Sequence, residues 1–215
     1  MAMKPKVMDA LLKVLEQLKP VPSPCAPEVR EWWDKTALPL LRDQSLSELR
    51  RNDDYPPRIM GFMEGGGMGV VNVSEAMGGE WGSVLSKDIT AHIHRIAAVV
   101  PGTYASVFCS EAWGLRANKA GEFERQREKY PSLGDHPDAY EMVVFQMLHY
   151  ERETNRMMQL STMIEILKVF AARRTPHTWL HTKLADKVDT TDPLDTSKGA
   201  TMTGRFVFGD PEKPT

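Results

Sequence analysis

The chain has 215 residues, of which 41% are hydrophobic and 26% are charged, as expected for a globular protein with one substantial core. Its 27 basic and 29 acidic residues nearly balance, so we expect neither a nucleic-acid partner nor an anionic membrane surface. The two cysteines, Cys25 and Cys109, form no C-x-x-C pair, which argues against a zinc ribbon or a disulfide framework. The longest strongly apolar run, IAAVVP, is too short to span a bilayer.

The first part of the chain is predicted to be helical. Apolar residues recur at helical spacing from about Pro5 to Lys19, and Leu11 and Leu15 lie on that apolar stripe. A stiff proline-rich linker, PVPSPCAP, should separate this helix from a second one. The second helix should begin at Pro27 and be kinked or ended by Pro39.

The pattern then changes from helix to strand. Ser45 and Glu48 have capping-box spacing, which predicts a short third helix. The segments YPPRIMGF and GVVNVSEAM flank a glycine cluster and predict a β-hairpin. The clearest amphipathic helix of the chain follows, with an apolar stripe formed by Leu85, Ile89, Ile93, Ile96 and Val100.

Strands dominate the next part of the sequence. TYASVFCSEAW reads as a strand, and the charged stretch NKAGEFERQREKY reads as an exposed helix or ordered loop. YEMVVFQMLHY and RMMQLSTMIEILKVF, separated by ERETN, predict a long hairpin. The sequence then becomes polar and ends with a brief RFVF strand before a proline-bearing tail.

Together these elements predict an α+β fold. A helical N-terminal segment should precede a mostly antiparallel sheet of four to five strands, with the long amphipathic helix packed on one face. The expected domains are a helical segment at residues 1–50 that could dock on a partner, an α+β core at 51–175, and an extended polar C-terminal segment at 176–215 that includes the short terminal strand.

The glycine-rich stretch MEGGGMGV does not predict a cofactor site. A phosphate-binding loop of the Walker A type needs a lysine and a following helix, whereas here the strand-like VVNV follows and no lysine is near. The dinucleotide-binding fingerprint also requires a helix after its glycines. A hairpin tip is therefore the favoured interpretation, and no cofactor is expected.

Two pairs of histidines are candidate metal ligands. On a helix His92 and His94 point about 200° apart, with His92 beside the apolar stripe and His94 on the polar side, so they cannot complete one site. His177 and His181 would face together on a helix, yet the segment lacks the glutamate of H-E-x-x-H and a third ligand. They remain weak candidates, and surface or packing roles are favoured.

The stretch VFCSEAW raises the question of a catalytic carboxylate. Glu111 could act with His136, or with a C-terminal histidine, as the acid–base pair of a hydrolase. Cys109, inside a strand, is expected to be a buried and inert thiol. His136 belongs to an HPD tripeptide that predicts a turn entering a strand. For Glu111 we favour a structural role, as a polar anchor where the strand ends.

Partner contacts are the more promising source of function. Trp32 and Trp33 are adjacent on a predicted helix and diverge by about 100°, so one could enter the core while the other meets a partner. The proline-rich linker would separate the N-terminal amphipathic helix from the core, so Leu11 and Leu15 could also contact a partner. A single intramolecular core is the alternative.

Three features in chain order resemble uncharacterised small proteins encoded in bacteriophage and prophage genomes. They are VFCSEAW closing a strand, HPDAYEMVVF opening the next, and GRFVF near the C-terminus, within residues 103–208. The resemblance implies a phage setting and no known activity. We therefore expect a non-enzymatic structural or protein-interaction protein of the virion, found there or in the host cytoplasm before assembly, with protein partners or self-assembly. The alternatives are the Glu111 hydrolase and a phage effector that binds a host protein.

Overall fold

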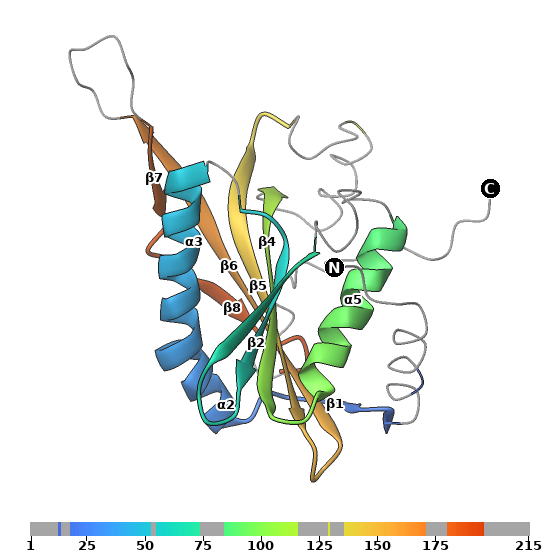
Figure 1. The fold of residues 1–215 in the computed structure, drawn as a ribbon. Coiled ribbons are helices and arrows are strands. Elements are labelled where there is room, and N and C mark those ends of the chain that lie inside the picture. The colour runs from blue at the N-terminus through green and yellow to red at the C-terminus, as the bar shows by residue number, and fades with distance from the viewer. Residues whose placement is uncertain are drawn as a thin grey trace.

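One mixed sheet lies between two helical layers (Figure 1). The computed structural model describes residue 13 and residues 18–52, 55–73, 84–115, 129, 136–170 and 180–195. Five strands form an antiparallel series, in which each strand pairs with the next. Their order is β3 (Met68–Asn72), β2 (Arg58–Met63), β4 (Thr103–Leu115), β5 (Ala139–Glu151) and β6 (Arg156–Phe170). None of the described helices is both long and apolar enough to cross a membrane.

The outer edge of β6 is covered by three short strands in succession. They are β1 (Val21–Ser23), which is parallel to β6, and β8 (Asp189–Thr191) and β7 (Leu180–Leu184), which are antiparallel to it. Because these three strands meet different stretches of the same long strand, one edge of the sheet is closed. The opposite edge is β3.

A helical run is unbroken from Pro27 to Asn52. It consists of α2 (Pro27–Trp32), one π-helical turn, η1 (Trp33–Ala37), and α3 (Leu38–Asn52). In η1 the Leu38 N–H donates to the Trp33 carbonyl, five residues back, so the turn is wider than an α-helical turn. The widened turn accommodates Pro39, whose ring would clash with the preceding turn of a regular α-helix.

The prediction of separate short helices here was therefore wrong. Pro39 neither ends nor breaks the helix, because the π-turn absorbs it. Ser45 does not cap a third helix: it lies in the middle of α3, where its hydroxyl donates to the Leu41 carbonyl at 2.7 Å. Ser45 and Glu48 therefore have capping-box spacing by chance, because both lie inside one long helix.

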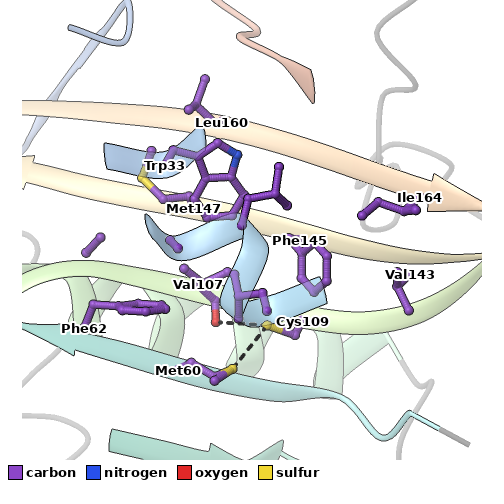
Figure 2. Packing of buried hydrophobic residues seen from close by; sticks show 14 of the residues in the cluster. Trp33, Met60, Phe62, Val107, Cys109, Val143, Phe145, Met147, Leu160 and Ile164 are labelled. Atoms are coloured by element: carbon purple, nitrogen blue, oxygen red, sulfur yellow. Dashed lines mark hydrogen bonds between the residues drawn. The ribbon is translucent and has the colours of Figure 1, made fainter. Parts of the chain in front are cut away.

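The main core lies between this helical run and the sheet. Alternate residues of the central strands point toward the helix, including Val107, Phe145 and Leu160, all fully buried (Figure 2). Trp33 lies at the centre of this cluster, and its indole Nε1–H donates to Thr162 Oγ1 at 3.0 Å. The aromatic ring thus fills the core while its polar atom is satisfied by the sheet.

The other face of the sheet is covered by α5 (Val84–Val99). Ile93 and Ala97 pack against a buried cluster that includes Ile59 and Phe108. Further along, Ile96 belongs to a second cluster over the β5–β6 hairpin. Helix α5 lies against β2, β4 and β5, the strands nearest to the β3 edge.

The predicted fold class was wrong in its architecture. The described part of the chain has eight strands in one mixed sheet and two helical runs, rather than a helical N-terminal segment followed by four or five mostly antiparallel strands. The extra strands have only three to five residues, too few for a periodic pattern to be visible. Both predicted hairpins, the long strand β4 and the helix α5 are confirmed. The RFVF strand lies outside the described residues, as do nearly all of the charged stretch and nearly all of the first helix.

Candidate functional site

Glu111 has a backbone partner. It lies within β4, which continues to Leu115, so it does not mark the end of the strand as predicted. Its Oε2 accepts a hydrogen bond of 3.3 Å from the backbone N–H of Tyr55, which precedes β2. The carboxylate therefore attaches Tyr55 to the sheet.

The structure does not assemble the predicted pair of Glu111 and His136. His136 is buried in the turn before β5, where its Nδ1 accepts the Asp138 N–H at 3.0 Å. In the β4–β5 ladder Glu111 lies opposite Val143, whereas His136 precedes the first residue of β5. The two positions are separated by more than four residues, on the order of 13 Å along the strands. Their described hydrogen bonds are to backbone amides and not to each other.

A polar cluster fixes α3 to the sheet beside Glu111. Both carboxylate oxygens of Glu48 accept hydrogen bonds from the two terminal nitrogens of Arg58, one at 2.6 Å. The Arg58 guanidinium also lies over the Tyr55 ring, 4.6 Å from its centroid. Sequence reasoning missed this pair, because it assigned Glu48 to a helix cap. The one signal in the sequence was Arg58 in the next element, a cation that could pair with the glutamate.

Cys109 is buried beneath this cluster, as predicted. Its thiol lies 3.6 Å from the Met60 sulfur (Figure 2). Burial raises the pKa of the Cys109 thiol to about 12, so the thiol is protonated at neutral pH. A protonated thiol is a poor nucleophile, which agrees with the expectation of an inert cysteine.

Of the remaining ligand and partner candidates outside the helical run, His181 alone lies in a described element. His181 lies in β7, opposite Val169 of β6, while His177, Leu11 and Leu15 lie outside the described residues. In the described part of the chain no group of three or more His, Cys, Asp or Glu side chains could hold a metal ion.

The two tryptophans both serve the intramolecular core. Trp33 is fully buried and is therefore not available to a partner. Trp32 is half-buried and meets Phe62 and Tyr104 edge-on, with ring centroids 5.3 Å and 4.7 Å away. Tyr104 lies where the β2–β4 register shifts by one residue, an irregularity of the β-bulge type.

An exposed apolar surface occurs instead on the β2–β3 hairpin. The tight turn between the strands uses Gly65, Gly66 and Gly67, all with positive φ. On β3, Met68 is 41% exposed and Val70 is 50% exposed. Strand β3 contains no charged residue and no proline, which are the usual protections of an exposed sheet edge.

The outer edge of β3 also presents hydrogen-bonding groups. The Val73 N–H donates to the Pro57 carbonyl at 3.0 Å, so the odd-numbered residues of this segment face β2. Because bonding direction alternates along an antiparallel strand, Met68 and Val70 direct their N–H and C=O groups away from β2. No other strand of the described residues pairs with this edge. The hairpin therefore combines apolar side chains with an open backbone ladder.

Comparison with known proteins gives no relative from which a function could be transferred. No family model, no curated protein and no solved structure matches the chain.

Proposed function

We propose that this chain is a non-enzymatic structural protein that assembles with a second copy of itself through the outer edge of β3, as a component of a bacteriophage particle. The observation that supports the assembly is the edge itself, which is apolar, free of charged side chains and open along its backbone. Such an edge is a template for pairing with another strand.

A second copy fits this edge because the strand is self-complementary about Val70. In an antiparallel two-fold arrangement the outward groups of Val70 pair with those of Val70 of the second copy. The same register places Val71, which is 46% exposed, opposite Gly69 of the second copy. A Cβ added at Gly69 would meet no atom within 4 Å, so this position has room for an opposing side chain. No like charges meet across the axis, because β3 has none.

The phage setting is supported by the sequence resemblance within residues 103–208. A particle component assembled from repeated copies needs an interface between identical chains, which a strand-edge contact supplies. Mass spectrometry of purified virions tests this part of the proposal. We expect the chain among the particle proteins, and its absence from virions would overturn the assignment to the particle.

The assembly itself is tested by a charge placed on the edge. In the Val70→Lys variant the lysines of the two copies would lie opposite each other, and their repulsion should abolish the pairing. The fold itself should tolerate the lysine, because position 70 is exposed. The matched control is Leu40→Lys on α3, where the leucine is 47% exposed and remote from β3 in sequence. Light scattering after size exclusion should show a dimer for the wild type and the control, and a monomer for Val70→Lys. A monomeric wild type, or a dimeric Val70→Lys, would contradict the proposal.

A further inference from the structure

A pocket of about 300 Å³ opens on the face of the sheet that bears α5. It lies beside α5, over β4, β5 and β6. His94 and Arg95 of α5 line it, together with Phe108 of β4, Gln146 of β5 and Gln159 of β6. Its volume is at the lower end of the range for small-molecule sites.

Gln146 is the most informative residue of this pocket. It is only 8% exposed, and no described residue forms a hydrogen bond with its carboxamide. A carboxamide that lines a pocket without a protein partner keeps its donor and its acceptor available to a ligand or to water. Gln159 of the next strand is its diagonal neighbour and also has no described side-chain partner. Two carboxamides thus present paired donors and acceptors to the pocket.

His94 adds an uncharged acceptor. Its Nε2 lies 3.1 Å from the Ser106 carbonyl oxygen, and a carbonyl can only accept, so Nε2 bears the proton. Nδ1 is then left as an acceptor. Burial lowers the pKa of His94 to about 4, so the ring is neutral at physiological pH. A neutral imidazole suits a ligand group that donates a hydrogen bond.

The remaining walls define the shape and the charge of a ligand. Phe108, directly opposite Gln146 in the β4–β5 ladder, supplies an aromatic wall, and Leu148 and Met157 extend the apolar surface. Arg95 is exposed at the pocket and has no described ion-pair partner. Among the described residues that line the pocket, none is acidic. The chemistry therefore fits a planar ring with an amide-like edge and an anionic substituent.

We propose that this pocket binds a nucleoside monophosphate. The carboxamides of Gln146 and Gln159 would pair with the adjacent donor and acceptor of the base, as glutamine pairs with adenine in nucleic-acid complexes. Phe108 and the neighbouring apolar side chains cover the ring, and Arg95 contacts the phosphate. This inference is independent of the β3 edge, which belongs to a different part of the sheet.

The test measures binding of AMP, GMP, CMP and UMP to the full chain by isothermal titration calorimetry, with the four nucleosides and inorganic phosphate as comparison ligands. We expect at least one nucleotide to bind with a dissociation constant below about 1 mM, and inorganic phosphate alone not to bind. The nucleoside of that base should bind about tenfold more weakly. If none of the four nucleotides binds at millimolar concentration, the proposal is overturned.

Variants separate this pocket from binding elsewhere. Gln146→Leu removes the carboxamide with little change in volume and should weaken the nucleotide about tenfold. Gln44→Leu, on α3, makes the same chemical change on the other side of the sheet and should bind as the wild type does. Arg95→Gln should weaken the nucleotide but not the nucleoside. If Gln146→Leu fails to fold in a thermal melt, Gln159→Leu takes its place. If the folded glutamine variant bound the nucleotide with wild-type affinity, the assignment of the nucleotide to this pocket would be wrong.

Discussion

At the scale of single residues, the histidines of α5 show what a helical pattern cannot reveal. The sequence pattern assigned His94 to the polar side of the helix and His92 to the edge of the apolar stripe. In the structure His94 is buried and His92 is exposed. The reason is the Ser106 carbonyl, which accepts the His94 N–H and makes burial of the ring tolerable. That partner lies on another element, so the pattern of α5 alone could not disclose it.

The burial of His94 predicts a loss of stability in acid. Its pKa is lowered to about 4 in the fold, below the ordinary value of 6.5, so between these values the unfolded chain binds a proton that the folded chain excludes. Stability should therefore be full above pH 6.5 and fall by roughly 3 kcal/mol as the pH drops toward 4. Urea unfolding at a series of pH values measures this. His94→Gln, which retains a donor for the carbonyl, should flatten the curve over this range. A variant as acid-sensitive as the wild type would refute the explanation.

The Glu48–Arg58 pair gives a second prediction at this scale. The Glu48→Ala variant would leave the Arg58 guanidinium without the Glu48 carboxylate. Because the Arg58 side chain is only 10% exposed, water could replace that partner only in part. We expect a loss of roughly 2–4 kcal/mol in the free energy of unfolding. Glu31→Ala, which removes an exposed partner of Lys35 on the same helical run, should cost less than about 1 kcal/mol. Chemical denaturation compares the two, and equal losses would show that the buried pair has no special role.

At the scale of elements, the long helical run is fixed to the sheet through its π-turn. The turn holds Trp33 at the centre of the core and tolerates Pro39 immediately afterwards. The indole N–H reaches Thr162, whose hydroxyl lies 2.9 Å from that of Thr190 in β8. One aromatic residue thus links the helix to β6 and, through the second threonine, to the covered edge of the sheet.

This arrangement predicts that the two adjacent tryptophans contribute unequally. Trp33→Phe should lower the free energy of unfolding by roughly 1–3 kcal/mol, since it leaves a cavity and removes a hydrogen-bond donor from the core. Trp32→Phe, at a half-buried position on the margin of the same core, should cost clearly less, because it removes no described hydrogen bond. Thermal unfolding of the two variants provides the measurement. A larger loss for Trp32→Phe would contradict the assigned roles.

The elements that sequence reasoning found are those with long internal patterns. The alternation of β5 and β6 and the stripe of α5 extend over more than ten residues each, so local chemistry was sufficient to predict them. Strands β1 and β8 have three residues, and β1 lies within the proline-rich linker, where only pairing with β6 makes it a strand. The exposed β3 edge could have been suspected from GVVNV, which lacks any charged residue. The pocket depends on residues from several elements and had no local signature.

At the scale of the whole molecule, the two edges of the sheet differ. One edge is closed by β1, β8 and β7 along the length of β6, while the other edge is the uncharged strand β3, with which no further strand of the described residues pairs. Natural sheets protect exposed edges with charge, proline or cover, and the covered edge here shows the same protection. An open edge beside a closed one is the arrangement expected for a chain that continues its sheet into a second copy.

Amide hydrogen exchange across a dilution series tests this central claim most directly. The N–H groups of Met68 and Val70 point outward from β3, whereas those of Gly69 and Val71 face β2. Pairing of two β3 strands predicts that the Met68 and Val70 amides are protected in concentrated samples and lose protection on dilution. The Gly69 and Val71 amides should stay protected throughout. Rapid exchange of Met68 and Val70 at every concentration would show that the edge remains unpaired and would contradict the account.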